Sequence, residues 1–229
     1  MNKHLNIFNI LNILLILSCL TLGTCFVIYG GIIFKSLASA CFVAVGLVNL
    51  ICAIKNKSFN LKFCIVMLIG LVFAMLGDIV LYVHFIAGAV LFAIGHVFFF
   101  VAYCFLQKFK WIDLIIGASI AIISVLIVTL VPTFEFGGTV MELLCSIYAV
   151  IISFMVGKAL SNLIRMPNIL NLIILLGSAL FFLSDLMLLI YVFGGNQIVF
   201  DIICLATYYP AECLLAYSLK QTIKIKESN

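Results

Sequence analysis

Long uncharged apolar stretches alternate with short charged segments along the whole chain of 229 residues. A helix that crosses a bilayer needs about 20 mostly apolar residues, and the charges recur at nearly that interval. The uncharged stretch from Leu5 to Phe34 contains a Gly30-Gly31 pair, which predicts a turn between the first two helices. The second helix then covers Ser36 to Ile54, and six further helices are predicted at about 62–83, 86–107, 112–131, 139–160, 168–193 and 199–219. The pattern therefore predicts an all-α polytopic membrane bundle of eight transmembrane helices, in a single integral membrane domain over 1–229.

Composition excludes several protein classes. Apolar residues make up 67% of the chain and charged residues 9%, whereas a soluble domain is nearer half apolar and one quarter charged. A net charge of +4 is too small for a basic groove, so we expect no nucleic-acid partner. The first apolar run after Lys3 also fits a signal peptide, but its length and the lack of a small-residue cleavage site favour a retained helix. Nine cysteines are spread singly, without metal-ligand or disulfide spacing.

The basic residues are distributed unevenly between the two ends of the predicted bundle. Eleven of the twelve fall at the end that carries both termini: Lys3, Lys55, Lys57, Lys62, Lys108, Lys110, Lys158, Arg165, Lys220, Lys224 and Lys226. Lys35 falls at the other end. Because cytoplasmic loops carry an excess of Lys and Arg, we expect a multi-pass protein of the cell membrane with both termini in the cytoplasm. A seven-helix arrangement would scatter these charges over both sides.

A weak internal repeat relates the two halves of the chain. At an offset of 107 residues Gly70 aligns with Gly177, Asp78 with Asp185, and Lys35 with Glu142. Four helices per half is an even number, so the halves 1–110 and 111–229 would be two parallel four-helix repeats, related by an axis along the membrane normal. The matched aspartates are the most informative part of the repeat, because acids at equivalent places in both halves need a shared reason.

Most charges are expected in the cytoplasmic loops, and the exceptions are five charged residues and a histidine: Lys35, Asp78, Glu142, Asp185, Glu212 and His96. A charge in the bilayer is costly unless it faces another polar group or water. The sequence therefore predicts a polar cavity in the outer half of the bundle. Lys35 can pair with Glu142 or with either aspartate, and His96 can be a core histidine that a hydroxyl satisfies. Glu212 can share a hydrogen-bonded patch with Tyr208, one turn earlier.

Four motifs follow one another along the predicted helices: L-G-D-I-V-L-Y at 76–82, G-A-V-L-F-A-I-G-H at 88–96, L-S-D-L at 183–186 and T-Y-Y-P-A-E at 207–212. In this order the chain resembles the YhhN family of membrane lysoplasmalogenases over nearly its whole length. Lys35 and Tyr148 match further positions of the family pattern. The chain departs from that pattern at Glu212, where the family usually has Gln, and at Phe99, where a Tyr often follows the His.

The resemblance implies hydrolysis of the vinyl ether bond of a lysoplasmalogen, which yields a fatty aldehyde and glycerophosphoethanolamine or glycerophosphocholine. This reaction needs an acid that protonates the β-carbon and an anion near the resulting oxocarbenium ion, as two carboxyls with different pKa values provide in glycosidases. Asp78 and Asp185 are the expected catalytic pair. The candidate substrate-binding residues are Lys35, His96, Tyr148, Ser184, Tyr209 and Glu212. The expected partners are a lysophospholipid and the bilayer, with no metal and no cofactor.

A second class of function fits the same residues. Parallel repeats, acids within the membrane and Pro210 in the last helix are also typical of a small proton-coupled transporter or a lipid-binding receptor. Release of aldehyde by the purified protein would indicate the hydrolase. Acid-dependent flux in sealed vesicles, without aldehyde, would indicate the transporter.

Overall fold

The computed structural model describes residues 3–223, and its regular structure over that range is entirely helical. The eight α-helices are α1 (Lys3–Tyr29), α2 (Ile32–Lys55), α3 (Leu61–Leu81), α4 (Phe85–Leu106), α5 (Trp111–Leu130), α6 (Thr139–Arg165), α7 (Ile169–Phe193) and α8 (Ile198–Ser218). A short 3₁₀ helix, η1 (Leu219–Thr222), continues α8. All eight α-helices are long and apolar enough to span a membrane. The predicted all-helical architecture with eight spans is therefore confirmed.

The helix boundaries follow local backbone chemistry. Gly30 and Gly31 have φ angles of 68° and 92°, in the left-handed region that favours glycine, so the predicted turn between the first two helices is present. Asn60 and Asn168 cap α3 and α7 by accepting hydrogen bonds from backbone N–H groups three residues later. The sixth helix continues to Arg165, five residues beyond its predicted end.

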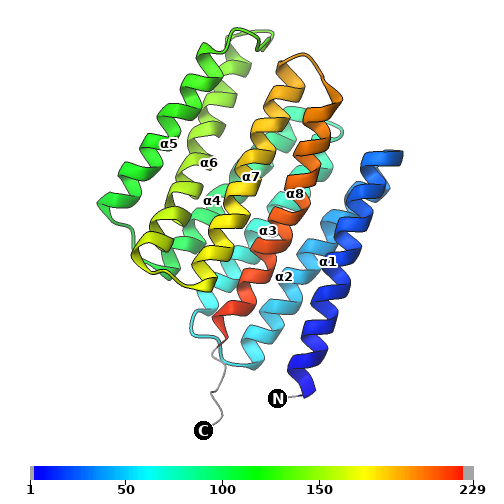
Figure 1. The fold of residues 1–229 in the computed structure, drawn as a ribbon, viewed down its shortest axis with the longest axis vertical. Helices are drawn as coiled ribbons and strands as arrows, with labels where there is room; N and C mark the ends of the chain where they lie inside the picture. The colour runs from blue at the N-terminus through cyan, green and yellow to red at the C-terminus, as the bar shows by residue number, and fades with distance from the viewer. Residues whose placement is uncertain (1–2, 224–229) are drawn as a thin grey trace.

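Six of the helices form a closed ring. In the order α2, α3, α4, α6, α7 and α8, each helix packs against the next, and α8 returns to α2. The other two lie outside the ring, on opposite sides of the bundle in Figure 1. α1 packs on α2 and α8, whereas α5 packs on α6. Side chains from the six ring helices therefore meet in the interior, where the candidate site lies.

The helix contacts of the first half recur four helices later. The pairs α1/α2, α2/α3 and α3/α4 correspond to α5/α6, α6/α7 and α7/α8, and the two halves meet through α4/α6 and α2/α8. The match is incomplete, because α1 contacts α8 whereas α5 does not contact α4 among the described residues. The division into two four-helix halves remains a prediction that this pattern supports.

Small residues allow the closest helix pairs to approach. A Cβ atom at Gly157 on α6 would lie 2.6 Å from the Cα atom of Gly117 on α5, and one at Gly88 on α4 would overlap the backbone of Leu81 on α3. Membrane helices use such positions because close backbone contact provides van der Waals attraction where the surrounding lipid is as apolar as the side chains.

One cluster of charges differs from its predicted location. Lys158 was expected among the loop charges, but it is fully buried on α6, and its Nζ atom lies 2.7 Å from the Asp113 carboxylate on α5. Ser161 and Arg165 of α6 contact the same carboxylate. The additional turns of α6 present these side chains to α5, so the cluster ties the two helices together near the end that carries the termini. Lys224 and Lys226, which share the predicted charge bias, lie outside the described residues.

Candidate functional site

Asp78 lies in a saturated polar cluster between α2, α3 and α8. Its Oδ1 atom is 2.6 Å from Lys35 Nζ, and its Oδ2 atom accepts a hydrogen bond of 2.5 Å from Ser39 Oγ. The Tyr209 hydroxyl donates a longer bond of 3.4 Å to the same Oδ2 atom. Lys35 and Asp78 are both buried, so their pairing offsets the cost of placing two charges within the bundle. Of the three partners left open for Lys35, the structure selects Asp78.

Asp185 lies in a second cluster, between α4, α6 and α7. The Tyr148 hydroxyl donates a hydrogen bond of 2.6 Å to Asp185 Oδ2. His96 Nε2 is 2.8 Å from the Tyr148 oxygen and 3.2 Å from Asp185 Oδ2. Because Tyr148 donates its hydroxyl hydrogen to Asp185, its oxygen can accept a hydrogen bond from a protonated His96 Nε2. His96, Tyr148 and Asp185 therefore form one hydrogen-bonded group.

The two aspartates lie at different depths from the end opposite the termini. Asp78 is three residues before the end of α3, and Asp185 is eight residues before the end of α7. At about 1.5 Å of rise per residue, these positions are about 5 and 12 Å from the helix ends. Asp185 is thus the deeper of the two, and both lie in the half of the bundle opposite the termini.

Aromatic rings connect the two clusters. The His96 ring is 4.6 Å from Phe181, Phe181 is 5.4 Å from Tyr208, and Tyr208 is 5.1 Å from Tyr209, measured between centroids. Phe92 lies 5.8 Å from both Phe181 and Tyr208. The sequence predicted that most of the intramembrane charges share one polar cavity, but the structure shows two polar clusters joined by aromatic side chains. The aromatic residues occupy the interior because they pack edge to face, which favours such clusters.

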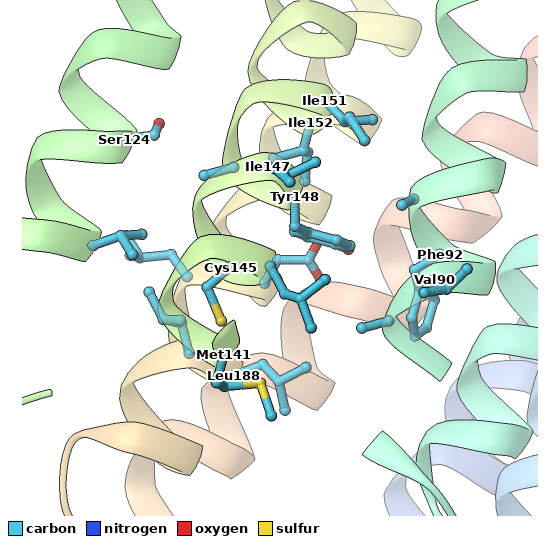
Figure 2. Close-up of a pocket in the computed structure, with 18 of the residues that line it drawn as sticks. Val90, Phe92, Ser124, Met141, Cys145, Ile147, Tyr148, Ile151, Ile152 and Leu188 are labelled. Atoms are coloured by element: carbon cyan, nitrogen blue, oxygen red, sulfur yellow. The ribbon is translucent and has the colours of Figure 1, made fainter. Parts of the chain in front are cut away.

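A cavity of about 190 Å³ lies beside the second cluster, between α4, α5, α6 and α7. Figure 2 shows Val90 on α4 and Ser124 on α5 at its two sides, with Tyr148 on α6 between them. Asp185 also lines this cavity, and nearly all of the remaining lining residues are apolar. Asp78 and Lys35 do not line it. The cavity therefore combines one carboxyl with surroundings suited to hydrocarbon.

The two carboxyls differ in how many of their oxygens have a hydrogen-bond partner in the protein. Both oxygens of Asp78 are occupied by donors. Asp185 receives its hydrogen bonds on Oδ2, and no described residue donates to Oδ1 or accepts from it. An oxygen without a protein partner can make a hydrogen bond to a bound molecule, whereas both oxygens of Asp78 already have partners within the protein. This difference was not visible in the sequence, where the two aspartates looked equivalent.

The remaining candidate residues are more buried than expected. Ser184 lies 3.4 Å from the Cys204 sulfur and does not line the cavity. Glu212 is fully buried, and neither carboxyl oxygen has a hydrogen-bond partner among the described residues. The hydrogen-bonded patch suggested for Glu212 and Tyr208 is absent from the described part, because the Tyr208 hydroxyl donates to the backbone oxygen of Ala74 instead.

Sequence reasoning missed Ser39, which donates to Asp78. It lies four residues after Lys35, so both side chains fall on one face of α2, and that spacing was an available signal. Asp113 was missed as well, although it lies within the predicted fifth span.

Known proteins were compared with the whole chain. A search of curated proteins and a search of solved structures each found no match. The sequence model of the YhhN family matches residues 30–219, which include the two aspartate clusters, the cavity and all of the helices from α2 to α8. The multi-pass membrane fold and this match, which spans most of the chain, establish that the protein belongs to the YhhN family.

Proposed function

We propose that this protein hydrolyses the vinyl ether bond of lysoplasmalogens, with Asp185 as the proton donor. The observation that carries the proposal is that Asp185, whose Oδ1 atom has no hydrogen-bond partner among the described residues, lines a cavity that is otherwise almost entirely apolar. Membership of the YhhN family supports a hydrolase, and the resemblance of its motifs to the lysoplasmalogenases supports this substrate. A lipid ether can place its chain among apolar side chains while its oxygen lies beside the carboxyl.

The proposed reaction uses one carboxyl twice. Asp185 transfers the proton on Oδ1 to the β-carbon of the vinyl ether, and the double-bond electrons form the new C–H bond. The α-carbon becomes an oxocarbenium ion, which the Asp185 carboxylate stabilises. Water then adds to that carbon and gives its proton back to the carboxylate. The resulting hemiacetal loses the glycerol oxygen as an alcohol, so that the products are a fatty aldehyde and a glycerophospho-head group.

His96 and Tyr148 are proposed to position the acid. The bond from Tyr148 fixes Oδ2, which leaves Oδ1 available to a molecule in the cavity that Asp185 lines. His96 in turn holds the Tyr148 hydroxyl and packs edge to face against Phe181, which limits the rotation of its ring. Because a positioned acid within reach of the reacting carbon contributes about a hundredfold or more to the rate, small displacements of Asp185 should be costly.

Asp78 has a different role in this proposal. Its carboxyl holds Lys35, which has three N–H donors and uses one of them on Asp78. The cluster lies closer to the helix ends than Asp185, at a depth that suits the phosphate of the head group. We assign Lys35 to that phosphate, since an ammonium group is a good ligand for it. Asp78 and Asp185 thus remain the functional acids, with separate tasks.

The orientation in the membrane follows from the charges. Lys57, Lys62, Lys108 and Lys110 lie at the end where α1 begins and α8 ends, and we propose that this end faces the cytoplasm of a cell membrane. Asp78 and Asp185 then lie in the outer half of the bilayer. A substrate of the outer leaflet would present its head group and ether bond at these depths.

Purified protein in lipid nanodiscs, incubated with a lysoplasmalogen, tests this function through release of the fatty aldehyde measured by mass spectrometry. We expect wild type and Glu135→Gln, a control acid on the exposed loop before α6, to release aldehyde at similar rates. We expect Asp185→Asn to lower the rate by about a hundredfold or more while the protein remains folded. Absence of aldehyde from the wild type, together with acid-dependent flux in sealed vesicles, would favour the transporter instead.

A further inference from the structure

The cavity beside Asp185 lies between two helices that do not touch. Residues of α4 and α5 face each other across it, yet among the described residues these helices share no backbone contact, and α5 packs on α6 alone. At the equivalent place in the other half, α1 does pack on α8. The bundle is therefore closed where α1 meets α8 and open between α4 and α5. The cavity lies on the open side.

Several side chains that line the cavity also reach the outer surface of the bundle. Ile86 and Val90 on α4 are 39% and 48% exposed, and Ile147 on α6 is 50% exposed. In Figure 2, Ile147 lies next to Tyr148 on α6, and Val90 lies across from them on α4. Because these helices span the membrane, the exposed parts of these side chains face lipid tails. The side chains that line the cavity thus also border the hydrocarbon region of the bilayer.

The end of the cavity nearest the water is covered by aromatic side chains. Phe136, from the loop between α5 and α6, lies 4.8 Å from Phe193, and Phe193 lies 5.7 Å from Phe85, which lines the cavity. The backbone N–H of Glu135 donates a bond of 2.9 Å to the Phe193 carbonyl, which pins the loop onto the end of α7. A molecule arriving from the water would have to displace this cover, whereas one arriving from the bilayer would not.

We propose that the gap between α4 and α5 is a lateral route by which a single-chain ether lipid passes from the bilayer to Asp185. The proposal rests on the proposed function and adds the path of its substrate. Exposure of an acyl chain to water costs about 0.8 kcal/mol for each CH₂ group, and a chain that stays in hydrocarbon throughout avoids this cost. The cavity has about the volume of six water molecules at about 30 Å³ each, so it receives the ether bond and the first few carbons, while the rest of the chain remains in the gap and the surrounding lipid.

Two tryptophan substitutions on α4 test the route. Val90 and Val97 are each 48% exposed and lie seven residues apart, but only Val90 is among the residues that line the cavity. In nanodiscs we expect Val90→Trp to lower kcat/KM for a lysoplasmalogen by about tenfold or more, and Val97→Trp to stay within about twofold of wild type. Equal activity of Val90→Trp and wild type would overturn the route. So would an increase of about tenfold on Phe136→Ala, since that result would place the access at the aromatic cover.

A labelling experiment tests the lateral route independently of the hydrolysis reaction. Asp185→Asn protein in nanodiscs is irradiated with a lysophospholipid that carries a diazirine near its ether or ester linkage, and adducts are mapped by mass spectrometry. We expect adducts on α4 and α6 at the cavity, which excess unlabelled lysoplasmalogen and Val90→Trp both suppress. Adducts confined to the loop 131–138 would overturn the route, as would adducts spread evenly over lipid-facing helices. A wild type that labels as expected but releases no aldehyde would refute the proposed function and leave the route intact.

Discussion

The ion pair between Lys35 and Asp78 allows a test of the role of Asp78. Asp78 either takes part in proton transfer or holds Lys35 and the fold in place. Both side chains are about 5% exposed or less, and their charged atoms are 2.6 Å apart. Asp78→Asn keeps the shape of the side chain and its hydrogen bonds to Ser39 and Tyr209 within reach, but it leaves the Lys35 ammonium buried without a counter-charge. We therefore expect a large loss of stability from the single substitution.

The size of this loss can be estimated from the burial. Removing one partner of a buried ion pair costs about 3–5 kcal/mol, whereas replacing both by neutral groups of similar size is often close to neutral. In a chain of this length, 1 kcal/mol corresponds to about 2–4 °C in Tm. Asp78→Asn should thus lower Tm by about 10 °C, and the double variant Lys35→Met with Asp78→Asn should recover most of that difference.

Circular dichroism of the purified variants in one detergent measures the two unfolding temperatures, and aldehyde release is measured at a temperature where each variant is folded. We expect the double variant to keep kcat within about tenfold of wild type and to show a raised KM, because Lys35 no longer binds the head group. A double variant as unstable as Asp78→Asn would refute the ion-pair reasoning. A stable double variant as inactive as Asp185→Asn would show that Asp78 itself participates in the chemistry.

Three further substitutions test the packing and the buried charges through thermal unfolding. Asp113→Asn should lower stability by about 3 kcal/mol, because Lys158 is fully buried and would lose its counter-charge; an unchanged Tm would contradict this. Glu212→Gln should leave the stability unchanged or raise it, because the buried Glu212 carboxyl has no hydrogen-bond partner among the described residues. A marked loss of stability would contradict this expectation. Gly88→Val should separate α4 from α3 because its side chain would overlap the Leu81 backbone, at a cost of about 2 kcal/mol or more, whereas Gly88→Ala should cost less.

The fold was predictable because the membrane imposes a simple rule on the chain. Charged residues such as Lys55 and Lys110 interrupt the apolar runs where helices end, and Gly30 with Gly31 marks a turn that contains no charge. The rule fails where a charged residue lies inside the bundle next to a residue of opposite charge. Lys158 was counted with the loop charges, but it pairs with Asp113 inside the bundle.

The residues of the candidate site could be predicted from the sequence, but their separation into two clusters could not. Helical spacing indicated that Asp78 and Asp185 face the interior, and both do lie in polar clusters there. The sequence left three partners open for Lys35, because the choice depends on which helices are neighbours in space. The separation into two clusters depends on Phe181 and Tyr208, whose rings look like ordinary core residues in a sequence rich in phenylalanine.

Turnover in D₂O tests the central claim most directly, because protonation of the vinyl ether carbon leaves a permanent mark on the product. The account predicts that wild-type protein releases an aldehyde with a single deuterium at the carbon next to the carbonyl, above the background that unlabelled aldehyde acquires in the same buffer, and that Asp185→Asn releases almost none. An aldehyde without that deuterium, or undiminished release by Asp185→Asn, would contradict proton donation by Asp185.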